Sequence, residues 1–274
     1  MNTLLKRSLT GLGYAAVLIA GIIIHPLIFA GVFLSLLVLA LMEYYRMVKL
    51  AGGDPQQITG IITGVLFFGS LFGYVTGRLP LFAVLSAVLL LSTIFIIELY
   101  RKKPQPLANI AFTLLGFFYI ALPLGLLNFL IFPGLPQNTS FYPWILLGVT
   151  LIIWAFDTGA YLFGTAFGKH RLFERISPKK SWEGVFGGGT IALLTGVLNA
   201  WLFQILEITD WLVISALVII FGTFGDLIES MIKRSFDMKD SGRFLPGHGG
   251  ILDRLDSFLF AAPVIVAWLF FIGN

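Results

Sequence analysis

Two acidic and two polar or basic residues near the C-terminal end of the chain are spaced to act together. Asp226, Glu229, Ser230 and Lys233 stand at positions i, i+3, i+4 and i+7, so they share one face if this segment is helical. A face with two acids followed by a base can hold a metal ion beside a phosphate group. An ordinary stripe of salt bridges within the helix explains the same spacing, so this pattern alone does not decide between the two.

The segment that follows, from Lys233 to Asp256, favours the metal and phosphate interpretation. Asp253 and Asp256 are three residues apart at the start of the last apolar run and therefore share a face. Mg²⁺ prefers oxygen ligands, commonly one or two carboxylates together with substrate phosphates. We predict a metal site formed by Asp226, Asp253 and Asp256, although Asp253 would also serve as a simple helix N-cap.

Basic and small residues in two segments could bind the phosphates of a substrate. Glycines let the backbone approach a phosphate closely, and lysine or arginine neutralises it. The C-terminal segment offers Ser230, Lys233, Arg234, Lys239, His248, Gly249, Gly250 and Arg254. A second segment offers Ser177, Lys179, Lys180, Ser181 and Glu183. Adjacent lysines at a membrane edge also occur for orientation alone.

The composition identifies the elements that must position these residues. Of the 274 residues, 58% are hydrophobic and only 12% are charged, against roughly 25% charged residues in soluble domains. So few charges cannot cover the apolar surface of a soluble protein of this size. The chain is therefore an all-α, polytopic membrane protein. It contains no cysteine, which excludes disulfides, thiol nucleophiles and cysteine-ligated metals.

The apolar runs predict about nine transmembrane helices. They cover residues 9–24, 26–42, 58–77, 79–100, 107–132, 144–167, 184–206, 211–231 and 256–272. The first two are separated only by His25 and Pro26, so a single kinked helix is the alternative there. We divide the chain into N-terminal helices in residues 1–106 and site-bearing helices in residues 107–274, which together form one membrane unit.

The distribution of basic residues predicts the orientation in the membrane. With nine spans and a cytoplasmic N-terminus, 17 of the 18 basic residues face the cytoplasm and only Arg78 lies outside, as the positive-inside rule expects. The C-terminus then lies outside. The basic residues are used for orientation and for two loops, and no nucleic-acid-binding motif surrounds them, so nucleic acid is excluded as a partner.

Three further features inside the apolar runs need interpretation. Asp157 lies deep in its run, where a carboxylate normally faces a cavity or a partner. Glu98 lies one turn from Arg101, and we attribute it to snorkelling toward the membrane interface. The glycine-rich run GLGYAA at residues 11–16 follows no strand, so it is not a dinucleotide-binding fingerprint.

The sequence from Ser230 to Ser257, SMIKRSFDMKDSGRFLPGHGGILDRLDS, resembles the signature of the phosphatidate cytidylyltransferases, also called CDP-diacylglycerol synthases. The segments SPKKSWEG and DTGAY also resemble that family, and the similarity in architecture extends along most of the chain. The N-terminal hundred residues are less diagnostic.

This resemblance implies a nucleotidyltransferase of phospholipid biosynthesis that converts CTP and phosphatidate into CDP-diacylglycerol and pyrophosphate. It implies Mg²⁺ as cofactor and allows K⁺ as a second ion. We assign Asp226, Asp253 and Asp256 to the metal, and the same three residues with Lys233 to catalysis. The expected location is a bacterial inner membrane, with the active site facing the cytoplasm. A homodimer is an option that the sequence leaves open.

Two alternatives stay open at this point. A CTP-dependent kinase of a polyprenol or diacylglycerol would use similar parts but release CDP. A transporter would explain Asp157 and Asp226 within apolar runs, but it leaves the resemblance of the Ser230–Ser257 segment unexplained.

Overall fold

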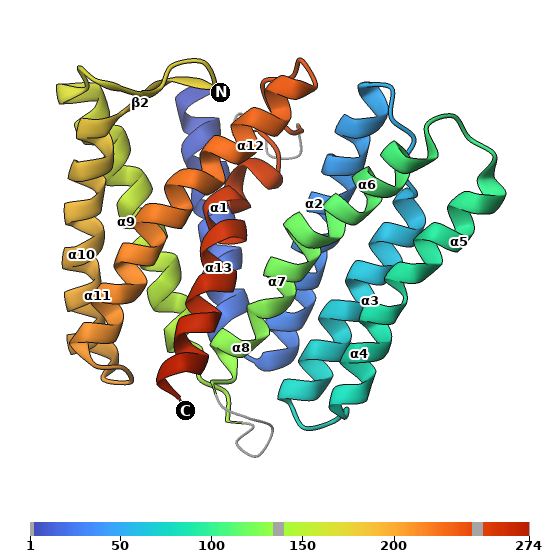
Figure 1. Cartoon of the computed structure of the whole chain (residues 1–274). Helices are drawn as coiled ribbons and strands as arrows, with labels where there is room; N and C mark the ends of the chain where they lie inside the picture. The colour runs from blue at the N-terminus through green and yellow to red at the C-terminus, as the bar shows by residue number, and fades with distance from the viewer. Residues whose placement is uncertain (1–2, 134–139, 243–248, 274) are drawn as a thin grey trace.

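The computed structural model describes residues 3–133, 140–242 and 249–273, with side chains from residue 10 onward. It is a bundle of helices with one short hairpin of strands, which agrees with the all-α class predicted from composition. Eight helices in the described part are long and apolar enough to cross a membrane, and the helix before them adds a shorter apolar stretch, Thr10–Ile23. The N-terminus and the C-terminus lie at opposite ends of the bundle (Figure 1).

The first two apolar runs form two helices rather than one kinked helix. Helix α1 covers Thr3–Ile23 and α2 covers Pro26–Leu50, and the two run in opposite directions (Figure 1). The His25 ring caps α2, because its Nδ1 accepts a hydrogen bond from the Leu27 N–H at 3.1 Å. Pro26 follows at the first helical position, where its missing N–H costs no hydrogen bond.

Six helices and one π-helical turn continue the N-terminal part of the bundle. They are α3 (Gln57–Val75), α4 (Leu81–Leu89), α5 (Leu91–Arg101), α6 (Pro106–Gly116), η1 (Phe117–Ala121), α7 (Leu122–Leu126) and α8 (Asn128–Ile131). The helices α4 and α5 together make one span, and the segment from α6 to α8 makes another. Three of the eight candidate spans consist of several pieces, the third being Ile208–Ser235, and the first predicted run corresponds to the shorter apolar stretch of α1.

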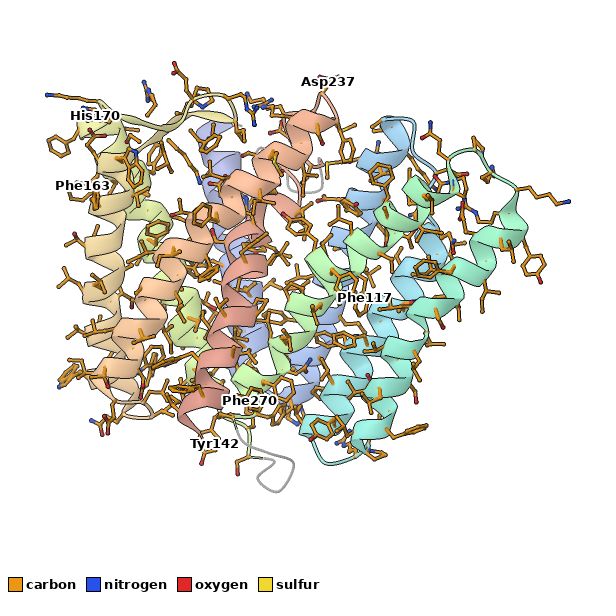
Figure 2. The ribbon with its side chains drawn as sticks, viewed as in Figure 1. Phe117, Tyr142, Phe163, His170, Asp237 and Phe270 are labelled. Atoms are coloured by element: carbon orange, nitrogen blue, oxygen red, sulfur yellow. The ribbon has the colours of Figure 1, made fainter. Side chains whose placement is uncertain are left out.

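The C-terminal part carries the predicted site. It consists of α9 (Trp144–Phe167), β1 (Arg171–Phe173), β2 (Ser177–Ser181), α10 (Trp182–Phe203), α11 (Ile208–Leu217), η2 (Val218–Gly222), α12 (Thr223–Ser235) and α13 (Leu252–Ile272). The strands pair antiparallel. In Figure 2, His170 and Asp237 mark the end of the bundle with this hairpin, and Tyr142 and Phe270 mark the other end.

Glycines allow α9 and α10 to pack backbone against backbone. A Cβ atom added at Gly188 would lie 2.6 Å from the Phe156 carbonyl oxygen, and one at Gly184 would lie 2.8 Å from that of Ala160. Small residues permit such an approach between membrane helices. Ser181 then caps α10 by accepting a hydrogen bond from the Gly184 N–H at 3.2 Å. This packing fixes β2, which leads into α10, at the end of α9.

The interpretation of Glu98 as a snorkelling side chain is wrong. Glu98 is buried, with 4% of its surface exposed. Its carboxylate accepts hydrogen bonds from Gln56 at 2.7 Å, Asn109 at 2.9 Å and Arg101 at 2.7 Å. These partners come from α5, α6 and the segment just before α3, so Glu98 holds three parts of the N-terminal bundle together. The three donors compensate the charge, so the side chain can stay buried rather than reach water.

Candidate active site

A polar cavity of about 530 Å³ opens among α9, β2, α10, α12 and α13. Most of its polar lining comes from two places: the hairpin strand β2 and the facing turns of α12 and α13. Its charged lining residues are Asp157, Lys179, Lys180, Asp226, Glu229, Lys233, Asp240, Asp253, Arg254 and Asp256. Segments separated by about a hundred residues therefore contribute to one site.

Three carboxylates lie together inside this cavity. One oxygen each from Asp226, Glu229 and Asp256 lies within 4.8 Å of the other two. Asp226 and Glu229 are one turn apart on α12, as their spacing predicted, and Asp256 faces them from α13. Glu229 is 2% exposed, and its Oε1 atom has no hydrogen-bond partner among the described residues. Oxygen donors arranged in this way fit a hard divalent cation.

Two lysines lie against the carboxylates. Lys180 Nζ from β2 is 2.5 Å from Asp226 Oδ2. Lys233 Nζ is 2.5 Å from Glu229 Oε2 and 2.5 Å from Asp253 Oδ1. The ammonium group of Lys233 therefore lies between two carboxylates and joins Asp253 to the group of three. Positive charge is thus concentrated at the places where an anionic substrate would meet the acidic cluster.

Asp253 is engaged more fully than the other predicted metal ligands. Its Oδ2 atom accepts hydrogen bonds from the Ser241 N–H at 3.1 Å, the Ser241 hydroxyl at 3.0 Å and the Gly250 N–H at 2.7 Å. Gly249 has a φ angle of +85°, a conformation that favours glycine. Asp253 therefore holds the backbone at Ser241 and at Gly250, two points of the segment between α12 and α13, and the Gly250 N–H is used for this contact.

A carboxylate from the N-terminal half reaches the same loop. Glu43 Oε2 on α2 accepts a hydrogen bond from the Leu252 N–H at 3.0 Å and lies 3.2 Å from the Ser241 hydroxyl, whose single proton is shared between Glu43 and Asp253. A Cβ atom added at Gly242 or at Gly250 would lie 2.4 Å from the Glu43 carboxylate. Leu252 is the first residue of α13, so Glu43 satisfies an N–H group that the helix itself leaves unpaired.

The remaining predicted substrate-binding residues fall into three groups. Lys179 and Arg254 line the cavity. Ser230 does not line it, although its hydroxyl donates to Asp226 Oδ1 at 3.4 Å. The others that the structure describes are not among the residues that line it: Ser177, Arg234, Lys239, Gly249 and Gly250. His248 lies outside the described residues.

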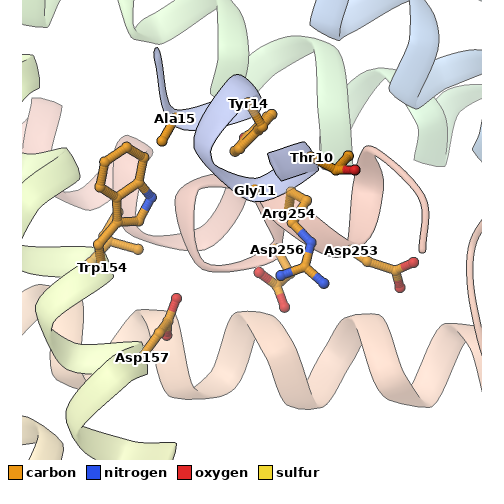
Figure 3. A pocket seen from close by; sticks show the side chains of 10 residues that line it. Thr10, Gly11, Tyr14, Ala15, Trp154, Asp157, Asp253, Arg254 and Asp256 are labelled. Carbon is orange, nitrogen blue, oxygen red and sulfur yellow. The ribbon is translucent and has the colours of Figure 1, made fainter. Parts of the chain in front are cut away.

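Asp157 lines the cavity, as its position inside an apolar run predicted. It comes from α9 and faces Arg254 and Asp256 of α13 across the site (Figure 3). Sequence reasoning placed Glu229 on the same helix face as Asp226 but left it out of the predicted metal ligands, and it did not consider Glu43. The burial of Glu229 and the contacts of Glu43 depend on neighbours distant in the chain, which spacing does not reveal.

The arrangement can bind and align two phosphate-bearing substrates. Basic side chains stand on the hairpin side and on α12, and carboxylates for a cation stand between them. In the described part of the site no serine or histidine is held in a nucleophile and base pair, so the geometry suits direct transfer between two bound substrates.

Comparison with known proteins gives the family. The model of the Cytidylyltransferase family matches residues 5–272. A phosphatidate cytidylyltransferase of Bacillus subtilis is 34% identical over 268 residues, which cover 95% of each chain. Phosphatidate cytidylyltransferases of Staphylococcus epidermidis and Staphylococcus saprophyticus are 50% and 51% identical over 117 residues, 42% of this chain. The matched stretch covers 45% of the length of each of these staphylococcal relatives, just under half. The chain belongs to the cytidylyltransferase family.

Proposed function

We propose that the protein is a phosphatidate cytidylyltransferase, which makes CDP-diacylglycerol and pyrophosphate from CTP and phosphatidate. The observation that carries this proposal is the similarity to the Bacillus subtilis enzyme over nearly the whole of both chains. The cavity supports it, because lysines that can bind phosphates and carboxylates that can bind a cation line the same cavity between the helices.

The reaction needs alignment and charge stabilisation more than it needs a protein nucleophile. An oxygen of the phosphatidate phosphate attacks the α-phosphorus of CTP and forms the new P–O bond. The bond from the α-phosphorus to the bridging oxygen breaks, and pyrophosphate leaves with that electron pair. Two anions must therefore be held in line, and the charge on the leaving group must be stabilised.

The basic residues of the cavity take these tasks. Lys179 and Lys180 on β2 bind the phosphates of CTP. Lys180 forms an ion pair with Asp226, which places it next to the carboxylate cluster. Lys233 stabilises the leaving pyrophosphate from α12, and its position is fixed by Glu229 and Asp253. Arg254, with a planar guanidinium that matches a phosphate, binds the lipid phosphate.

The metal is Mg²⁺ in this proposal, with K⁺ as the second ion. Asp226, Glu229 and Asp256 would hold the ion, and Asp253 would join them through Lys233, which contacts both Glu229 and Asp253. The fit rests on oxygen donors within 4.8 Å and on the unpartnered, buried Oε1 of Glu229. Mg²⁺ supplies Lewis-acid stabilisation of phosphate charge when bound.

The proposed location is a bacterial inner membrane with the site open to the cytoplasm. The hairpin, α12 and α13 bring their charged residues to the end of the bundle that carries the N-terminus (Figure 1). With that end inside, 17 of 18 basic residues face the cytoplasm, where CTP is available.

The test uses the purified full chain in detergent with phosphatidate, Mg²⁺ and CTP labelled in its α-phosphate. We expect label in a lipid product and release of pyrophosphate, and we expect EDTA to abolish both. An unlabelled lipid with accumulating CDP would overturn the proposal in favour of a lipid kinase. No product from folded protein would overturn both enzyme assignments and call for a solute-flux assay in proteoliposomes.

A further inference from the structure

A second, smaller cavity adjoins the catalytic cavity on its α1 side. It encloses about 240 Å³, less than half the volume of the catalytic cavity. Residues 10, 11, 14 and 15 of α1 form one wall, and Ile153, Trp154 and Asp157 of α9 form another. The segment GLGYAA, which fits no nucleotide-binding motif, therefore lines a cavity next to the site.

The two cavities share a wall of four charged residues. Asp157, Asp253, Arg254 and Asp256 line both of them. Figure 3 shows the Arg254 side chain between those of Asp256 and Asp253, with Trp154 and Asp157 facing it from α9. A group bound in the small cavity therefore lies next to the carboxylate cluster without occupying the space beside Lys179 and Lys180.

The lining chemistry of the small cavity differs from that of the large one. Arg254 is the one basic residue among its described lining residues, whereas Lys179, Lys180 and Lys233 line only the large cavity. The α1 wall is small or aromatic, with Gly11, Tyr14 and Ala15. The rest of its charged lining is the three carboxylates of the shared wall, Asp157, Asp253 and Asp256. One guanidinium beside the uncharged α1 wall can bind a single phosphate on a compact glycerol unit, and the larger cavity with three lysines suits a triphosphate.

An apolar groove on the surface of the bundle adjoins the small cavity. It measures about 400 Å³, runs between α9 and α10, and shares Trp154 with the small cavity. Ala155 and Thr158 of α9 and Leu198 and Leu202 of α10 line it. Leu198 is 50% exposed and Leu202 is 51% exposed, so this groove faces the lipid phase of a membrane.

We propose that phosphatidate binds along this path. Its phosphate and glycerol occupy the small cavity at Arg254, and an acyl chain lies in the groove between α9 and α10, past Trp154. This assignment rests on the proposed function. The attacking phosphate then comes from the α1 side of the shared wall, and CTP lies on the hairpin side with its triphosphate toward Lys179 and Lys180.

The experiment uses groove-filling variants of the full chain in mixed micelles and compares two lipids. Dioleoyl-phosphatidate has chains long enough to use the groove, whereas dihexanoyl-phosphatidate does not need it. We expect Ala155→Trp to raise the KM for the dioleoyl lipid about tenfold, with less than twofold change in the KM for the dihexanoyl lipid or for CTP. Leu194→Trp is the matched control, because Leu194 lies on α10, is 64% exposed and does not line the groove.

A variant in the small cavity tests binding of the lipid headgroup separately from binding of the acyl chain. Ala15→Leu should raise the KM for both lipids and leave the KM for CTP unchanged, because it narrows the space for the glycerol phosphate. An increase in the KM for CTP alone would overturn the headgroup assignment. Equal behaviour of Ala155→Trp and Leu194→Trp would overturn the groove assignment. Wild-type protein that makes no CDP-diacylglycerol would instead refute the proposed function.

A binding measurement covers the case in which a tryptophan insertion disturbs folding. Phosphatidate with brominated acyl chains quenches tryptophans that lie close to those chains. We expect stronger quenching of the wild type than of Trp154→Phe, and a smaller difference with brominated phosphatidylcholine at the same content. Equal differences for the two lipids would mean that Trp154 meets only bulk membrane lipid, and the proposal would be wrong.

Discussion

The two halves of the molecule surround their carboxylates in opposite ways. In the N-terminal half, Glu98 accepts hydrogen bonds from Gln56, Arg101 and Asn109. In the C-terminal half, Asp226, Glu229 and Asp256 crowd within 4.8 Å of one another, and Glu229 Oε1 has no partner among the described residues. The first carboxylate is surrounded by donors, and the second group consists mainly of acceptors.

This difference separates a carboxylate saturated with hydrogen bonds from a group of carboxylates that can accept a ligand. A buried carboxylate with enough donors adds cohesion and has no capacity left for a ligand. Carboxylates that face one another repel and are kept together only if the rest of the fold holds them there. The fold holds them with ammonium groups at their edges, Lys180 on Asp226 and Lys233 on Glu229, which leaves room for a cation between them.

The largest effect should come from the acidic cluster. Asp226→Asn should lower turnover at least about a thousandfold, equivalent to about 4 kcal/mol, because a charged oxygen ligand becomes a neutral amide. Asp253→Asn should do the same through the loss of its contact with Lys233. Formation of labelled CDP-diacylglycerol, measured against Mg²⁺ concentration, tests both variants.

Asp210→Asn is the control for this pair, because Asp210 lies in the first turn of α11, outside the catalytic cavity. All three variants should elute as the wild type does on size exclusion. Activity near that of the wild type in Asp226→Asn would remove this residue from the proposed metal site. The carboxylate cluster of the C-terminal half would then no longer differ from the Glu98 network in binding a ligand.

The Glu98 network should affect stability and leave chemistry alone. Glu98→Ala leaves the side chains of Gln56 and Asn109 without this acceptor in a buried place, so we expect a loss of roughly 2–5 kcal/mol of stability. Thermal unfolding in detergent measures it, and turnover per folded molecule should stay within twofold. Glu207→Ala, at an exposed carboxylate that makes no capping hydrogen bond, should change neither quantity. A selective loss of turnover in Glu98→Ala would mean that this network also serves the site.

The membrane-helix fold and the helix face that carries Asp226 could be predicted from the sequence because both depend on local patterns. Hydrophobic runs of sufficient length define membrane helices, and the spacing of Asp226, Glu229 and Lys233 places them on one face. The burial of Glu98 was not predictable in this way, because two of its donors come from segments 42 and 11 residues away. Glu43 lies 209 residues before its partner Leu252, and no local pattern connects them.

Glu43 links the two halves, so its removal should weaken catalysis with less effect than a ligand variant. Glu43→Ala removes the acceptor for the Leu252 N–H and the Ser241 hydroxyl, which loosens the start of α13 and the carboxylates on it. We expect kcat to fall about 10- to 100-fold, equivalent to about 1.4–2.8 kcal/mol, with the KM for CTP within threefold.

Two further variants test whether Glu43 supports catalysis through these hydrogen bonds. Glu43→Gln keeps an oxygen acceptor, so it should retain most of the wild-type kcat. Ser241→Ala combined with Glu43→Ala should lose less than the sum of the two single effects, because the variants remove one shared contact. Additive losses in that double-mutant cycle, together with a failure of Gln to rescue, would show that Glu43 does not support catalysis through its contact with Ser241.

The smallest effect should come from the exposed rim of the N-terminal network. Asp54, in the loop between α2 and α3, lies 3.0 Å from Arg101 and 3.3 Å from Lys103. Slight desolvation acts to raise the pKa of Asp54, but the hydrogen bond from Lys103 and the charge of Arg101 outweigh it and hold the pKa below its ordinary value of 3.8.

A lowered pKa of Asp54 in the folded state stabilises the fold at pH values above the ordinary pKa, and this contribution is lost as the pH falls through the lower pKa of the folded state. With 35% of the Asp54 side chain exposed, Asp54→Asn should cost no more than about 1 kcal/mol. Thermal unfolding of wild type and variant should differ slightly at pH 7, and the difference should disappear as the pH falls through the lowered folded pKa. A difference that persists below that pH would show that the effect does not come from the charge of Asp54.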